Sequence, residues 1–273
     1  MADHCFGGNA VLPTVSATSW MVNVCEDLYP GLSFFAYDNY RLYKGIVFDG
    51  KQTDQLSMDV EEISVTSDEV TLSAKVWSTN AKGFRVNHYA ADITLVNNVP
   101  ENPEYKGFDS RSLTLNDRVI EPYKSGTLFH GASFQNIEST LNVSDSKLTL
   151  CCRAPQVAAS TQGQFMINAT NPFVDDVLYQ AMLVWVRSDS GKGSLPSSAK
   201  RCEQFELILP GAEYFVSLDV VSSQPNSMIA NITLHSESGK IYTRMMDAEV
   251  TISEALNPLF LQNTVEVGKV SAV

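Results

Sequence analysis

The sequence is short of charge, and above all of positive charge. Charged residues make up 18% of the 273 residues, and 19 Lys and Arg stand against 31 Asp and Glu, a formal net charge of -12. Nucleic acids and anionic membrane surfaces are bound mainly by clusters of Lys and Arg. The charge balance therefore predicts neither a nucleic-acid-binding protein nor a membrane-surface protein.

Long apolar runs, a leader and paired cysteines are lacking as well. No stretch is long and apolar enough to span a bilayer. Residues 1–4 show neither the basic region nor the apolar region of a signal peptide. The five cysteines are odd in number and form no CxxC pair, so the sequence predicts neither a disulfide framework nor a metal site. We therefore expect a cytoplasmic protein, since a reducing compartment suits unpaired thiols.

Apolar residues are plentiful, at 44%, and two segments carry them at helical spacing. The first helix is expected over Thr14–Tyr29, after Pro13, and the second over Pro172–Arg187, after Asn171 as N-cap. The apolar residues that repeat at i, i+3, i+4 and i+7 are Ala17, Trp20, Met21, Val24, Cys25 and Leu28 in the first helix, and Val174, Val177, Leu178, Ala181, Met182 and Trp185 in the second. Val184 and Val186 widen the apolar surface of the second helix, so we expect it to be covered on several sides.

Each helix is followed by segments with strand patterns. These are Ser33–Tyr43, Glu62–Thr66, Val70–Trp77 and Phe84–Leu95 in the first half, and Glu138–Val143, Lys147–Cys152, Gln204–Leu209, Tyr214–Ser222, Met228–Leu234 and Lys240–Ser253 in the second. The order, one long helix and then several strands, occurs twice. The sequence therefore predicts an α+β protein of two similar lobes, each with one helix against an antiparallel sheet.

Two short motifs stand at the start of these units. His4, Gly8 and Pro13 have the spacing HxxxGxxxxP, and Asp176 and Gln180 have the spacing DxxxQ. Each motif alone is weak, because an isolated His is usually a surface residue and an Asp early in a helix usually interacts with the helix dipole. Their order, one at the start of each unit, is a stronger signal.

A third stretch, Leu128–Gln135, lies between them and contains His130, Gly131 and Phe134. Together the three motifs resemble the dehydratase domains of polyketide synthases and of polyunsaturated fatty acid synthases. Flanking stretches that add to the likeness are Val11–Val15, Tyr43–Phe48 and Gly126–Gly131. Ala132 stands where that family usually has Pro.

The resemblance implies a double hotdog fold, in which each of two lobes wraps a curved antiparallel sheet around a long helix. It implies an N-terminal lobe over 1–105 with the catalytic His, a linker over 106–120, and a C-terminal lobe over 121–273 with the catalytic Asp. Family members normally have a further strand before the His motif, so we expect an open sheet edge in the first lobe.

The resemblance also implies the removal of water from a 3-hydroxyacyl thioester, which gives a 2-enoyl thioester. His4 suits the base at C2, and Asp176 suits the acid for the 3-hydroxyl if burial raises its pKa. Backbone N–H groups near Gly8 and the N-terminus of the first helix are candidate donors to the thioester oxygen. Gln180, one helical turn after Asp176, is expected to orient its carboxyl group.

Other residues are expected to bind the substrate: Gly8, Pro13, Gln180, His130, Gly131 and Phe134. For His130, a structural hydrogen bond is an equal alternative. Tyr123 is a weaker candidate for a polar contact with the substrate.

No cofactor is expected, because in this family the phosphopantetheine arm of an acyl carrier protein holds the substrate. The expected partners are that carrier, the other domains of a parent synthase and a second copy in a homodimer. Lys192, Lys200 and Arg201 are candidates for the carrier's docking patch. Two alternative functions stay open: an aldol cyclase of the product-template type, and a non-catalytic acyl-binding or dimerisation scaffold.

Overall fold

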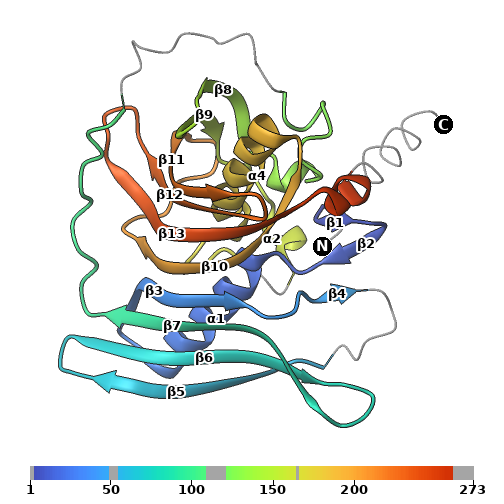
Figure 1. Ribbon diagram of the computed structural model, residues 1–273. Helices are drawn as coiled ribbons and strands as arrows, with labels where there is room; N and C mark the ends of the chain where they lie inside the picture. Colours follow the sequence, from blue (N-terminus) through green and yellow to red (C-terminus); the bar gives the residue numbers. More distant parts are fainter. Residues whose placement is uncertain (1–2, 49–54, 109–120, 164–165, 261–273) are drawn as a thin grey trace.

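The computed structural model describes residues 3–48, 55–108, 121–163 and 166–260. Its main feature is one ten-stranded antiparallel sheet with the order β5-β6-β7-β3-β10-β13-β12-β11-β9-β8 (Figure 1). A small second sheet has the order β1-β2-β4. No helix in the described ranges is both long enough and apolar enough to cross a membrane.

The first lobe contains one long helix and the strands that follow it. Its elements are β1 (Cys5–Phe6), β2 (Asn9–Val11), α1 (Thr14–Leu28), β3 (Ser33–Leu42), β4 (Val47–Phe48), β5 (Ser57–Val65), β6 (Glu69–Thr79) and β7 (Arg85–Val96). The helix predicted over Thr14–Tyr29 and the strand predicted over Val70–Trp77 are confirmed. Every second residue of β6, namely Val70, Leu72, Ala74 and Val76, is buried. Strand β5 ends the sheet, which gives the first lobe an open edge within the described residues.

The second lobe adds a hairpin in front of its helix. Its elements are η2 (Ala132–Phe134), β8 (Ile137–Val143), β9 (Lys147–Arg153), α2 (Ala159–Gln162), α3 (Pro172–Asp175), α4 (Val177–Ser190), β10 (Gly193–Gln204), β11 (Glu213–Gln224), β12 (Ser227–His235), β13 (Ile241–Ser253) and η3 (Glu254–Leu256). All residues from Val177 to Val186 are buried, as expected for a helix that is covered on several sides (Figure 1).

The two lobes repeat one strand order, which confirms the predicted duplication. The strands that follow α1 are neighbours in the order β3-β7-β6-β5. The strands that follow α4 are neighbours in the same relative order, β10-β13-β12-β11. The lobes join where β3 pairs with β10, in a register that sets Tyr37 against Cys202 and Asp38 against Arg201. The boundaries proposed at residues 105 and 121 remain predictions, and most of the linker expected over 106–120 lies outside the described residues.

Two predicted elements are wrong in detail. Residues 205–209 are not a strand; the strand is β10, which ends at Gln204. β10 contains Pro196 and many small polar residues, so it lacks the alternation of a half-buried strand, yet β3 and β13 bind it on both edges. The second helix is not continuous from Pro172, because Asp176 separates α3 from α4. Its predicted start is confirmed, since Asn171 Oδ1 accepts a hydrogen bond from the Phe173 backbone.

The proposed docking cations are mostly engaged in ion pairs. Lys200 lies 3.4 Å from Asp247, and Arg201 lies 2.7 Å from Asp38 across the joint between the lobes. Of the three, only Lys192 has no ion pair within the described ranges. Their role in docking a carrier protein remains a prediction.

Candidate functional site

A cavity of about 300 Å³ lies at the junction of the two lobes. Apolar side chains form much of its wall, among them Phe6, Leu12, Leu42, Phe129, Leu183 and Leu195. Four of the predicted site residues line it: His4, His130, Asp176 and Gln180. The chain thus brings together residues from its N-terminus, from the loop before β8 and from the start of α4.

His4 directly precedes β1, and one of its ring nitrogens makes a hydrogen bond to the backbone. Its Nδ1 lies 2.9 Å from the Val11 carbonyl oxygen, and the Val11 N–H donates back to the His4 carbonyl at 2.9 Å. A carbonyl can only accept, so Nδ1 carries the proton and Nε2 keeps a lone pair. Burial lowers the pKa of His4 to about 4, against the opposing effect of the Asp176 carboxylate. The ring is therefore a neutral base at neutral pH.

The glycine of the first motif shapes the turn that brings His4 to Val11. Gly8 has a φ of +79° between β1 and β2, a backbone conformation that other residues adopt at a cost. Gly8 is exposed and does not line the cavity, so the structure does not place its N–H where a substrate would lie. The N-terminus of α1 does reach the cavity, through Thr14.

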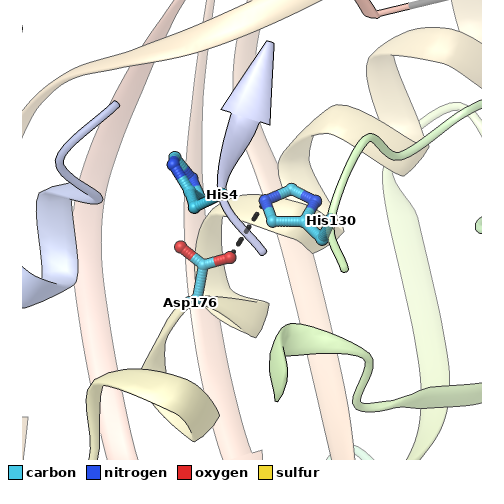
Figure 2. Close-up of side chains that lie close together, drawn as sticks. All are labelled: His4, His130 and Asp176. Atoms are coloured by element: carbon cyan, nitrogen blue, oxygen red, sulfur yellow. Dashed lines mark ion pairs between the residues drawn. The ribbon is translucent and has the colours of Figure 1, made fainter. Parts of the chain in front are cut away.

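Asp176 is buried between α3 and α4, with two donors on one carboxylate oxygen. Its Oδ2 accepts from Gln180 Nε2 at 2.8 Å and lies 3.0 Å from His130 Nε2. Figure 2 shows the other oxygen pointing to the side on which His4 lies. Burial alone would raise the pKa of Asp176, but His130, His4 and Gln180 together hold it below its usual value. The surroundings thus offset the effect of burial, and the acid role of Asp176, which needs a raised pKa, remains a prediction.

Gln180 is itself fixed from both sides. Its Nε2 also donates to the Phe134 carbonyl at 2.8 Å, and its Oε1 accepts from the Tyr123 hydroxyl at 2.7 Å. The same hydroxyl accepts from the backbone N–H groups of Asn136 and Ile137. These bonds leave the Gln180 amide one orientation, in which a donor faces Asp176. Tyr123 thus positions Gln180 and does not line the cavity.

The remaining predicted residues support the site without lining it. Pro13 precedes α1, and its carbonyl accepts the first helical bonds from Ser16 and Ala17. Phe134 is buried, with its ring centroid 5.6 Å from that of His4. Gly131 lies so close to Asp3 that a Cβ at this position would collide with the Asp3 side chain.

Asp3 and Asn136 are supporting residues that the motifs did not identify. Asp3 Oδ2 accepts from the Ser133 backbone and hydroxyl at 3.0 and 2.7 Å, and its carbonyl accepts from the Gly131 N–H, so the loop of His130 is bound to the residue before His4. Asn136 Nδ2 donates to two backbone carbonyls, one of them in α3. No spacing in the sequence marks either residue, because partners of each lie far away in the chain.

The adjacent carboxyl group, Asp175, has different surroundings. It lies between the lobes, near Cys202 and the face of α1 that carries Val15 and Thr18. Burial raises its pKa to about 7. Only Asp176 of the two lines the cavity with His4.

The cluster also has the composition of a metal site. The ligand-type atoms of His4, His130 and Asp176 lie within 4.8 Å of one another. Nε2 of His130 lies 3.0 Å from Asp176 Oδ2, a distance that a hydrogen bond between the two side chains explains without a metal. That no metal takes part remains a prediction.

Comparison with known proteins gives one family. The model of the polyketide synthase dehydratase N-terminal domain matches residues 108–259, more than half of the chain. This chain belongs to the polyketide synthase dehydratase family.

Individual relatives of this dehydratase domain agree. It is 29% identical over 244 residues to a polyunsaturated fatty acid synthase subunit of Thraustochytrium sp.; the match covers 88% of the chain but only 8% of that much longer protein. Among solved structures, the dehydratase domain of RzxB from Pseudomonas fluorescens has a TM-score of 0.71 at 12% identity, covering 92% of this chain and 89% of that one. A CurK dehydratase variant described as inactive, with Asp replaced by Asn, has a TM-score of 0.67 at 15% identity, covering 95% and 88%. These structures show that the fold is the double hotdog.

The protonation of His4 in this dehydratase domain is directly testable. We expect ¹⁵N NMR to show a neutral imidazole with its proton on Nδ1 from pH 8 down to pH 5, because burial lowers its pKa to about 4. In the unfolded chain the pKa of this His is near 6.5, so between pH 6.5 and pH 4 the unfolded chain binds more protons than the folded protein. The free energy of unfolding should therefore fall as the pH drops from 6.5 to 4, by up to about 3 kcal/mol from this group. The variant His4→Asn should lack that contribution; a His4 signal that titrates near pH 6.5 would contradict the expectation.

Proposed function

We propose that this domain is a 3-hydroxyacyl-[acyl carrier protein] dehydratase, a hydro-lyase that forms a 2-enoyl thioester and water. One observation carries the proposal: a neutral imidazole with a free lone pair and a carboxyl group face one largely apolar cavity from opposite lobes. A base and an acid on either side of a bound chain are what the elimination of water requires.

The proposed reaction has two proton transfers, one at His4 and one at Asp176. His4 Nε2 takes the proton from C2, the C2–H electron pair forms the double bond to C3, and the C3–O bond breaks as Asp176 protonates the leaving hydroxyl. The positive end of the α1 dipole, at Thr14, favours the negative charge that develops on the thioester oxygen. The cavity wall of Leu42, Phe129, Leu183 and Leu195 suits an acyl chain.

Asp176 must hold a proton before it can donate one. Its hydrogen-bond donors and neighbouring imidazoles favour the carboxylate. An acyl chain that fills the cavity displaces water, and desolvation raises the pKa of a carboxyl group. Asp176 therefore takes up a proton when the substrate binds, and it can then act as the acid.

The setting of the domain is part of the proposal. Since the chain matches a short part of a much larger synthase protein, we propose that its substrate arrives on the phosphopantetheine arm of an acyl carrier protein, with no other cofactor. Other domains of a synthase, a second copy of this domain and a cytoplasmic setting belong to the same proposal. The inactive CurK variant supports a role for an Asp in that dehydratase.

Mass spectrometry of a 3-hydroxyacyl thioester incubated with the protein tests the function. We expect a product lighter by one water from the wild type, and at least about 100-fold less from Asp176→Asn. The matched control is Asp175→Asn, which removes the neighbouring carboxyl group outside the cavity and should keep the activity within a few-fold. Cyclised poly-β-ketone in place of an enoyl product would favour the aldol cyclase, and tight acyl binding without turnover would favour the scaffold.

A further inference from the structure

Among the described residues that line the cavity, His130 makes a contact with Asp176 that the proposed roles of His4 and Asp176 do not explain. Its Nε2 lies 3.0 Å from Asp176 Oδ2, and the two side chains are each 5% exposed (Figure 2). Gln180 donates to the same oxygen from the other side. Two N–H donors thus converge on Oδ2, whereas neither of them binds the second oxygen of Asp176.

The other nitrogen of His130 indicates where a proton can and cannot reside. Its Nδ1 is inaccessible to solvent and has no hydrogen-bond partner among the described residues. Its ring stacks on Phe129 with centroids 4.1 Å apart and lies 6.4 Å from the ring of Phe134. A proton on Nδ1 would leave a buried N–H group without an acceptor, which is costly. The ring is therefore neutral, with its proton on Nε2 and a lone pair on Nδ1.

We propose that His130 is a positioning residue for the acid step: its Nε2–H holds Asp176 Oδ2, so that the proton for the leaving hydroxyl is carried on Oδ1. The inference rests on the proposed function and deepens it, because it states which atom delivers the proton and which residue stabilises what remains.

The proton balance follows from this arrangement. A proton taken up by the pair goes to Asp176, since His130 has no acceptor for a second N–H. It passes from Oδ1 to the 3-hydroxyl oxygen as the C3–O bond breaks, and water leaves. The carboxylate formed is stabilised at Oδ2 by His130 and Gln180, and His130 itself gains and loses no proton.

Other titratable groups surround this carboxyl group, and none of them replaces His130. The titratable side chains that act on Asp176 or are affected by it are His4, Asp175, Tyr123 and Tyr179. Among the interactions described for these side chains, none is a direct hydrogen bond to Oδ2.

Two variants distinguish the effect of losing the N–H donor from the effect of changing the ring. His130→Phe keeps a ring but removes the donor, and His130→Gln restores an N–H at the place of Nε2. We expect kcat for water loss to fall roughly 10- to 100-fold in His130→Phe, as for the loss of one hydrogen bond to a charged group, and to recover at least tenfold in His130→Gln. Thermal unfolding of both variants confirms that they are folded. A kcat within twofold of wild type in His130→Phe, or equal losses in the two folded variants, would overturn the proposal.

A measurement without substrate keeps this inference separate from the proposed function. In ¹³C NMR, with Asp176→Asn used to assign the signal, the Asp176 carboxyl should titrate at higher pH in His130→Phe than in wild type, and His130→Gln should reverse the change. ¹⁵N NMR of the wild type at neutral pH should show His130 with its proton on Nε2. If the wild type releases no water but these signals behave as expected, the dehydratase function is wrong, while the hydrogen bond by which His130 holds Asp176 Oδ2 stands. An unchanged Asp176 titration, or a His130 with protons on both nitrogens, refutes the positioning role even in an active enzyme.

Discussion

Replacement of His4 by Asn should lower kcat for water loss by roughly 10²- to 10⁴-fold, the usual contribution of a general base. Asn is the sharpest substitution here because its side-chain amide can still donate to the Val11 carbonyl, as His4 Nδ1 does, but offers no basic lone pair. The loop should therefore keep its shape while the chemistry is lost. Exchange of the C2 proton with deuterated solvent, followed by mass spectrometry, should stop together with product formation.

His88 provides the matched control. It is also buried and also places Nδ1 against a backbone carbonyl, that of Lys44 at 2.8 Å, but it does not line the cavity. His88→Asn should keep kcat within a few-fold of wild type. If folded His4→Asn still eliminates water at the rate of His88→Asn, then His4 is not the base.

Replacement of Asn136 by Leu should lower the free energy of unfolding by about 2 to 5 kcal/mol. Asn136 is 1% exposed and makes three side-chain hydrogen bonds: Nδ2 donates to the carbonyls of Phe134 and Phe173, and Oδ1 accepts from the Tyr214 hydroxyl. Leu has a similar volume but satisfies none of these groups. Because the Phe134 carbonyl also holds Gln180, we expect kcat to fall as well.

Urea unfolding measures this loss, with Asn142→Leu as the control. Asn142 lies in β8, the strand that follows Asn136, and is only half-buried, so its replacement should change stability by less than about 1 kcal/mol. In Asn136→Leu, the further change Tyr214→Phe removes one of the unpaired groups and should recover part of the loss. Equal stabilities of Asn136→Leu and Asn142→Leu would contradict this account of the network.

Much of the architecture was predictable because local spacing determines it. The helical repeat of apolar residues in α1, the alternation in β6 and the Asn171–Pro172 pair before α3 all depend on neighbours within a few positions. β10 was not predictable in this way. Its small polar residues form a strand because β3 and β13 supply hydrogen-bond partners on both of its edges, and those strands come from distant parts of the chain.

The candidate site, too, was predictable only where local spacing determines it. The motif spacing identified His4, Asp176 and Gln180, which do line one cavity. It could not decide the role of His130, since only the folded chain brings its Nε2 to Asp176 Oδ2. It also left the pKa of Asp176 open: burial and Gln180 were foreseen, but not the effect of His130, which helps to hold this pKa below its usual value.

By itself the sequence determined the helices, most strands, the duplication and the residue types available for catalysis, since each is a local pattern. Only the tertiary structure decided that His4 is neutral, that His130 contacts Asp176, and which oxygen of Asp176 is free. These properties depend on burial and on hydrogen bonds at about 3 Å between residues far apart in the chain. Such distances are set when the two lobes pack together, and no spacing along the sequence encodes them.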